Sequence, residues 1–159
     1  MKFAAAVIIC GSPKLVRFAA TDTPPQKDAK VTEAIKPIKY TNVKIPLWLF
    51  HCDTDPAVNR LGARIPFAML TGKATVDSKG ELVPAPGTLK SADRLVRYYV
   101  AKNKTSGNEV RYTEYQYGKG ERFRDLGMVT QGGYFSWEIA YKNQKMIDWM
   151  FNQVKNPEK

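Results

Sequence analysis

The sequence predicts an α/β fold, in which helices pack on a sheet built from short, buried strands. Two apolar runs, residues 4–9 and 47–50, have the length and composition of strands that are buried on both faces. Residues 110–117 are rich in β-branched and aromatic side chains and indicate a third strand. The clearest helical period lies near the C-terminus, where apolar residues stand at i, i+3, i+4 and i+7: Ile147, Met150, Phe151 and Val154.

The composition is that of one folded domain. The chain has 159 residues, of which 43% are hydrophobic and 11% aromatic, so it can bury a core and is unlike a disordered chain. We therefore treat residues 1–159 as a single domain. No stretch approaches the roughly 18 consecutive apolar residues of a membrane-spanning helix, and no membrane partner is expected.

The net charge of +10 raises the question of nucleic acid or an anionic surface as a partner. The basic residues are scattered along the chain, and nothing resembles an RNA-recognition, zinc-finger or basic-helix signature. Scattered charges of this kind usually form a solvated face rather than a track for phosphates. A nucleic-acid partner is therefore not expected.

The first strand is expected from Ala4 to Ile9, although the N-terminus superficially resembles a very short lipoprotein signal ending in Cys10. The apolar core is at the lower length limit for such a signal, and bulky Ile9 stands where a small residue should precede the cleavage site. A buried parallel strand that closes into a turn at residues 10–13 is the better interpretation. The sequence gives no convincing signal peptide and does not specify a compartment.

Two connections are expected to be irregular. Residues 21–30 are polar and broken by prolines, which predicts a loop, and residues 31–38 are expected to form a short helix or turn. A second loop is expected at residues 118–133, after the third strand.

The middle of the chain is expected to contain an insertion and a helix. Residues 60–90 are rich in glycine and proline, and the sequence Asp-Ser-Lys-Gly at 77–80 suits a tight hairpin turn between short strands. We expect this hairpin-like insertion to lie beside the site. Ser91 is expected to cap a helix that runs to about Lys104.

Candidate functional residues gather where the second strand ends. The only histidine of the chain, His51, and the carboxylates of Asp53 and Asp55 lie within five residues there. In open α/β sheets the chemistry lies outside the carboxyl ends of the parallel strands, so these side chains are well placed. They share one short loop and have no second cluster of ligands, so neither a metal nor a cofactor is expected.

The same stretch resembles the His-Gly-x-x-Asp-x-x-Val-Pro segment that delivers the acid of the catalytic triad in α/β-hydrolase esterases. His51, Asp55 and Val58 match this segment. Cys52 stands in place of the glycine and Asn59 in place of the proline. The segment alone is moderately specific, and the C-terminal region strengthens the resemblance.

The C-terminal region is similar to the ending of carboxylesterases and peptidases related to feruloyl esterases and prolyl oligopeptidases. Residues 133–141 read Gly-Tyr-Phe-Ser-Trp-Glu-Ile-Ala-Tyr, and residues 147–153 read Ile-Asp-Trp-Met-Phe-Asn-Gln. The family pattern is Gly-His-x-x-Trp, then Ala-Tyr, then Trp-x-Phe-x-Gln. The run at residues 3–11 also resembles the family's Phe-Ala-Ala-Ala-Val-x-x-x-Cys-Gly, with one residue fewer before the cysteine, so the similarity covers nearly the whole chain outside residues 60–90.

This resemblance implies a partial α/β-hydrolase fold: the C-terminal strands of a mostly parallel sheet, with flanking helices and a hairpin-like insertion. It implies that Asp55 is the triad acid, while His51 supports the acid loop and Asp53 is a turn residue. The family's general base is a histidine three positions before the tryptophan that matches Trp137, and Tyr134 occupies that position here. Tyrosine, with a pKa of about 10, is a poor base near neutral pH.

The nucleophile is absent as well. The family's strained Gly-x-Ser-x-Gly elbow should precede the strand at residues 4–9, and this chain has no such motif. Ser12, in Cys-Gly-Ser-Pro, lacks the second glycine and follows the wrong strand. The resemblance thus implies the C-terminal piece of a serine hydrolase for carboxylic esters or peptides, inactive alone. The alternative is a non-catalytic hydrolase-like binding module.

A partner is expected at the first strand. In the resembled fold this strand has neighbours on both sides, including the nucleophile strand, so one edge would be left open here. An open edge with an apolar surface is the pattern that recruits another chain. We expect either an N-terminal hydrolase half or self-association through the strand from Ala4 to Ile9.

Overall fold

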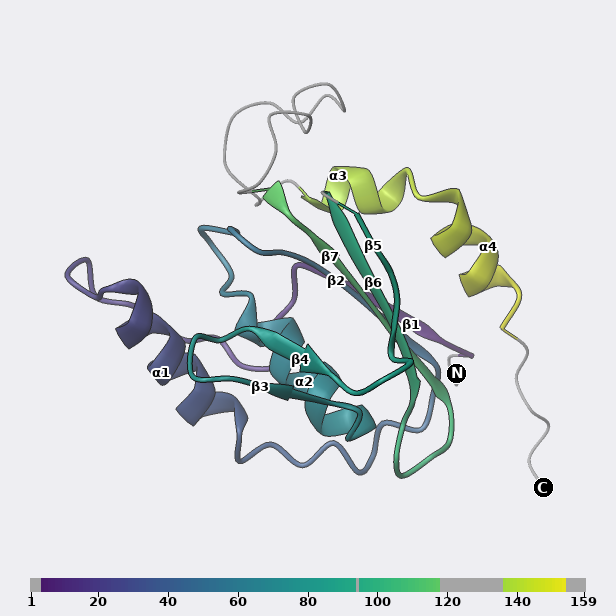
Figure 1. The fold of residues 1–159 in the computed structure, drawn as a ribbon, viewed down its shortest axis with the longest axis horizontal. Helices are drawn as coiled ribbons and strands as arrows, with labels where there is room; N and C mark the ends of the chain where they lie inside the picture. The colour runs from purple at the N-terminus through teal and green to yellow at the C-terminus, as the bar shows by residue number, and fades with distance from the viewer. Residues whose placement is uncertain (1–3, 94, 118–135, 154–159) are drawn as a thin grey trace.

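A mixed five-stranded sheet forms the centre of the computed structural model (Figure 1). The structure describes residues 4–93, 95–117 and 136–153. The strands lie side by side in the order β1 (Ala6–Ile9), β2 (Leu47–Cys52), β7 (Glu109–Tyr115), β6 (Val96–Lys102) and β5 (Leu89–Ala92). The described part of the chain also contains a two-stranded hairpin, β3 (Ala74–Val76) and β4 (Leu82–Pro84), and four helices: α1 (Pro24–Ile35), α2 (Leu61–Thr71), α3 (Ser136–Tyr141) and α4 (Gln144–Phe151).

The three strands predicted from composition are confirmed, and they are adjacent and parallel. β1 pairs with β2 in a register that places Ala6 beside Leu47, and β2 pairs with β7 so that Leu47 lies beside Val110. β6 and β5 extend the sheet beyond β7 in antiparallel orientation. β2 is buried along its whole length, because it has a strand on each side and a helix over each face.

Helices cover both faces of the sheet (Figure 1). α2 and the hairpin lie over one face, where Leu49 and Phe67 belong to the same apolar cluster. α3 and α4 lie over the other face, where Trp48 and Trp149 pack edge to face with ring centroids 5.4 Å apart. α1 packs against α2 and is thereby held beside the first face.

The loop predicted at residues 21–30 is wrong, because α1 begins inside it. Thr23 precedes the helix, and the side chain of Gln26 accepts a hydrogen bond from the Thr23 main-chain N–H at 2.8 Å. Pro24 and Pro25 occupy the first positions of the helix, where a main-chain N–H has no partner inside the helix anyway. The prolines that indicate a loop in the sequence therefore start a helix.

The helix predicted at residues 91–104 is also wrong, because this segment forms the end of β5 and all of β6. Its two tyrosines lie on opposite faces of the sheet, as consecutive strand residues must. Tyr98 lies near Trp48, with ring centroids 5.7 Å apart, while Tyr99 lies near Phe67 at 5.9 Å. Pairing with β7 and burial of the second tyrosine outweigh the helical spacing.

The segment predicted as a hairpin-like insertion, residues 60–90, contains the expected hairpin and also an unexpected helix, α2. The hairpin turn is fixed by Asp77, whose Oδ1 accepts hydrogen bonds from the N–H groups of Lys79 and Glu81, both at 2.8 Å. Gly80 has φ +75°, which favours glycine. α2 begins directly after the turn that carries Asp55, and the glycine and proline inside α2 obscure its helical pattern in the sequence.

The C-terminal helix exists as predicted, but the residues that it buries are not those that form the apolar period in the sequence. Met146 and Trp149 are buried, whereas Phe151 is 79% exposed. Trp149 is drawn inward by its contact with the sheet and by a hydrogen bond of 3.0 Å from its Nε1 to Glu109. Val154, the last residue of that period, lies outside the described residues.

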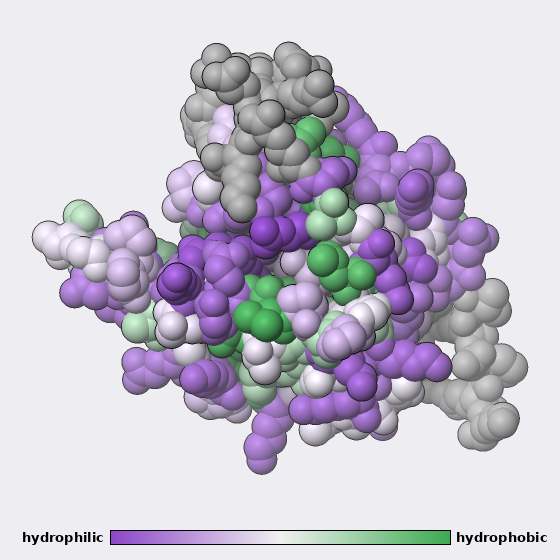
Figure 2. All heavy atoms as spheres, viewed as in Figure 1, coloured by the Kyte–Doolittle hydropathy of each residue, from purple (hydrophilic) through white to green (hydrophobic). Residues whose placement is uncertain are grey.

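Hydrophilic side chains cover most of the face that carries the hairpin, with small apolar areas near its centre (Figure 2). Among the helices that the structure describes, none combines the length and apolar character needed to cross a bilayer. The loop predicted at residues 118–133 lies outside the described ranges.

Candidate active site

The turn after β2 fixes the carboxylate of Asp55 through one oxygen, while the other oxygen accepts no hydrogen bond from the described residues. The turn is anchored first by Asp53, whose N–H donates to the carbonyl of Tyr115 at 2.9 Å. Oδ1 of Asp55 then accepts hydrogen bonds from the N–H groups of Ala57 at 2.8 Å and Val58 at 2.9 Å. Oδ2 is buried and has no hydrogen-bond partner among the described residues. The carboxylate is therefore fixed by the main chain through one oxygen, with the other available to a further donor.

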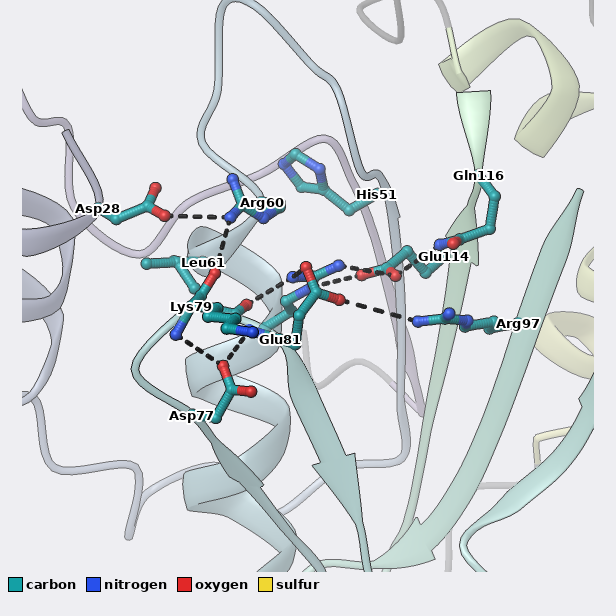
Figure 3. Close-up of polar contacts among 12 residues, drawn as sticks. Asp28, His51, Arg60, Leu61, Asp77, Lys79, Glu81, Arg97, Glu114 and Gln116 are labelled. Atoms are coloured by element: carbon teal, nitrogen blue, oxygen red, sulfur yellow. Dashed lines mark hydrogen bonds and ion pairs between the residues drawn. The ribbon is translucent and has the colours of Figure 1, made fainter. Parts of the chain in front are cut away.

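A second anchor ties this turn to α1 (Figure 3). Asn59 donates from Nδ2 to Oδ1 of Asp28 at 2.7 Å, and Arg60 donates from Nη2 to Oδ2 of the same carboxylate at 3.0 Å. Oδ1 of Asn59 accepts from the N–H of Leu61 at 2.9 Å, where α2 begins. In the resembled segment Asn59 is only a departure from the proline. An asparagine just before an apolar run is a sequence signal for the start of a helix, and this signal indicates the role of Asn59.

His51 is fully buried beside this turn. Its Nδ1 lies 2.9 Å from both the main-chain N and the main-chain O of Cys52, and its Nε2 has no partner among the residues that the structure describes. Burial lowers the pKa of His51 below its ordinary value, and the main chain of Cys52 and the charges of Asp55 and Glu114 offset this only in part. The imidazole is thus neutral near neutral pH.

A buried polar network lies next to His51 and joins three elements (Figure 3). Glu114 of β7, the register partner of His51, accepts hydrogen bonds from Arg64 of α2 at 2.6 and 2.9 Å. It accepts two more from Tyr112 at 2.6 Å and from Gln116 at 2.7 Å. Arg64 also donates to the carbonyl of Gly80 in the hairpin turn.

This network is structural rather than catalytic. Burial alone would raise the pKa of Glu114, but the hydrogen bonds and charge of Arg64, with help from Tyr112 and Gln116, hold it below its ordinary range. A carboxylate with four donors and no access to water does not exchange protons readily. Glu114 and Arg64 are not recognisable in the sequence as a pair, because nothing local links two residues that are 50 positions apart.

None of the described hydroxyl or thiol groups at this end of the sheet is arranged as an activated nucleophile. The hydroxyl of Ser12 donates to the carbonyl of Lys14 at 2.9 Å, and the side chain is exposed. Cys52 is buried, and burial raises the pKa of its thiol to about 11, so the thiolate is scarce at neutral pH. The two cysteines form no disulfide.

The remaining predicted site residues lie in the C-terminal region. Tyr134 falls outside the described residues. Trp137 lies on α3, is 37% exposed and packs against Tyr141, with ring centroids 6.1 Å apart. α3 contacts β1 and β2 and lies at the end of the sheet where β7 finishes (Figure 1). The structure thus places Asp55 and His51 around one turn, and α3 follows the segment that contains Tyr134.

Within the described residues, no three His, Cys, Asp or Glu side chains are grouped so that they could hold a metal ion. Comparisons of the chain with models of known protein families, with curated proteins and with solved structures each found no match.

Proposed function

We propose that this chain is the C-terminal part of a serine hydrolase of the carboxylesterase or peptidase type, and that it supplies the acid of the triad. The observation that carries the proposal is the geometry of Asp55. Two main-chain N–H groups hold Oδ1, while Oδ2 is shielded from water and has no partner among the described residues. A triad acid needs such an oxygen, because it orients an imidazole through one hydrogen bond and stabilises the imidazolium.

The topology supports the same proposal. β1, β2 and β7 are adjacent and parallel in chain order, and the acid turn follows the middle strand. The segment with Tyr134 follows the third strand and leads into α3. In the hydrolases that the sequence resembles, the acid and the base follow consecutive strands in this order. The position of α2 directly after the acid turn also agrees with that family, in which a helix usually follows the acid segment.

The chain alone lacks two of the three triad roles. No Gly-x-Ser-x-Gly elbow occurs in the 159 residues, and the base position holds Tyr134. His51 does not replace the base, because it is fully buried and its Nδ1 faces the main chain of Cys52. Its role is to support the acid turn. We therefore infer that the isolated chain does not hydrolyse esters.

The missing nucleophile would come from an N-terminal hydrolase half that pairs with the open edge of β1, whereas a second copy could cover that edge but would bring no nucleophile. The N–H groups of Ala6 and Cys10 donate to β2 and the residue before it, at 3.0 and 2.9 Å. The alternate residues Val7 and Ile9 therefore direct their N–H and C=O groups toward the outer edge. No strand among the described residues pairs with that edge.

A chimaera tests the proposed role of Asp55. A nucleophile-bearing N-terminal half of an esterase of this family is joined to this chain carrying Tyr134→His, and the hydrolysis of p-nitrophenyl acetate is measured. Asp55→Asn should then lower kcat by on the order of 10³ to 10⁴, because the imidazole loses its orienting carboxylate. Asp53→Asn is the matched control and should change little. Equal effects of the two substitutions would show that the acid is wrongly assigned.

The alternative is a non-catalytic hydrolase-like binding module. It is favoured by one observation, the tyrosine at the position of the family's base. In that case the chimaera with Tyr134→His would fold, as judged by circular dichroism, and would show no turnover that depends on Asp55.

A further inference from the structure

Two cavities meet beside α2, away from the candidate active site. The first, which we call the apolar groove, has a volume of about 300 Å³ and lies between α2 and the adjacent face of β1 and β2. Its walls are almost entirely apolar and include Ile8, Leu49, Ala63 and Pro66. Neither His51 nor Asp55 lines it. Ile8 is 41% exposed, so the groove opens to the surface at β1.

The second cavity, which we call the basic pocket, has a similar volume of about 300 Å³ and a different chemistry. Three lysines line it: Lys36 and Lys39 after α1, and Lys104 after β6. No aspartate or glutamate lines it, and none of the ion pairs among the described residues involves these lysines. An anion placed here would meet positive charge that no carboxylate of the pocket neutralises.

Tyr40 and Leu70 line both cavities and so mark their junction. The hydroxyl of Tyr40 is buried and has no hydrogen-bond partner among the described residues. Burial raises the pKa of Tyr40 to about 12, so the group stays protonated and is a hydrogen-bond donor. A buried hydroxyl without a partner is costly and is uncommon in native structures, which indicates an acceptor that binds at this point.

We propose that the groove and the pocket together bind a single-chain amphiphile, an alkyl chain that ends in a carboxylate or phosphate. The chain lies in the apolar groove, and the head group lies among the three lysines and accepts a hydrogen bond from Tyr40. An uncharged apolar molecule would leave the lysines and the hydroxyl unused. A free anion without a chain would leave the groove exposed to water. This site is separate from the proposed triad acid and does not depend on it.

Calorimetric titration of the purified chain tests the proposal, with each probe kept below its micelle concentration. Laurate, dodecyl phosphate, dodecanol and octanoate are compared. We expect 1:1 binding of at least one of the two dodecyl-chain anions, and binding of dodecanol at least tenfold weaker. Octanoate should bind on the order of 10² times more weakly than laurate, because each buried methylene contributes about fourfold in affinity. The stronger of the two anions identifies the head group as carboxylate or phosphate.

Variants assign the binding to this site. Tyr40→Phe keeps the ring and removes the donor, so it should weaken the anions by about tenfold and dodecanol by less, because a hydrogen bond to a charged acceptor is the stronger one. Lys36→Gln combined with Lys39→Gln should weaken the anions similarly, while Lys145→Gln, an exposed lysine of α4 outside both cavities, is the control. Ile8→Ser should weaken every probe.

Two results would overturn the proposal. Absence of saturable binding by both dodecyl-chain anions would show that no amphiphile site exists. Equal binding of dodecanol and laurate, unchanged by the tyrosine and lysine substitutions, would show that the groove is apolar surface suited to a polypeptide partner instead.

Discussion

Arg64 and Glu114 form a two-point ion pair, with Nε 2.6 Å from Oε2 and Nη2 2.9 Å from Oε1, although each side chain is only 1% exposed. The pair connects α2 to β7 and, through Gly80, to the hairpin turn. Removing one member of such a pair leaves a buried charge without compensation.

Glu114→Gln should therefore destabilise the chain strongly. We expect the free energy of unfolding, measured by urea denaturation, to fall by about 3 kcal/mol or more. Arg64→Met alone should cost a similar amount, and replacing both residues, as Arg64→Met with Glu114→Gln, should recover much of the loss, because no unpaired charge remains. Strictly additive effects in this double-mutant cycle would contradict a coupled pair.

His51 should make stability depend on pH. Its folded pKa is lowered by burial, so the unfolded chain, with a histidine pKa of about 6.5, takes up the proton first as pH falls. Stability should accordingly decrease below about pH 6.5, with a slope approaching 1.4 kcal/mol per pH unit for one proton. His51→Gln should flatten this part of the urea midpoint profile.

Glu114 and Arg64, which pack next to His51, lose their charges outside this pH range and do not obscure the effect. Glu114 has a lowered folded pKa, so its contribution is lost only at more acidic pH, below its unfolded value of about 4.3. Arg64 stays charged throughout. An unchanged slope between roughly pH 6.5 and 5 in the His51 variant would mean that another group carries the proton.

The isolated chain should be inactive as a serine hydrolase. Because nucleophile and base are both absent, turnover of p-nitrophenyl acetate should not exceed that of a heat-treated sample. A fluorophosphonate probe should label no serine, and Tyr134→His alone should restore nothing. Stoichiometric labelling of Ser12 or any other serine would contradict this expectation.

The open edge of β1 should make the chain associate. Light scattering after size exclusion at micromolar concentration should show a dimer or larger species in the absence of another partner. Val7→Pro should reduce this association, because it removes an N–H that points outward and not one that pairs with β2. Val7→Ala is the matched control for the lost side chain. A stable, cooperatively unfolding monomer would show that the edge is covered.

The parts of the fold that follow local rules could be predicted. The strand at residues 47–50 is recognisable because its apolar run is short and ends in polar turn residues, and the turn that carries Asp55 could be located for the same reason. The structure of residues 91–104 could not be predicted, because the spacing of its aromatic residues suits a helix and only pairing with β7 makes it a strand. The ion pair of Arg64 with Glu114 depends on tertiary contact alone.

The orientation of α4 shows the same limit. Its sequence has apolar residues on more than one side, so either Phe151 or Trp149 could face the core. Trp149 is buried because Trp48 and Glu109 offer it a ring contact and a hydrogen-bond acceptor. Which of the two apolar faces is buried therefore depends on the surface of the sheet that the helix packs against, and the helix sequence alone does not reveal it.

The two hydrogen bonds of Asp28, to Asn59 and Arg60, make α1 a support for the turn that carries Asp55, even though α1 contributes no group to the proposed site. Local opening of a protein proceeds in cooperative units that share contacts. α1 and residues 55–60 should therefore exchange their amide hydrogens together, and Asp28→Ala should speed exchange in both segments while leaving β7 protected. Whatever displaces α1 would also release Asp55, so the precision of the proposed acid depends on a helix at the periphery of the fold.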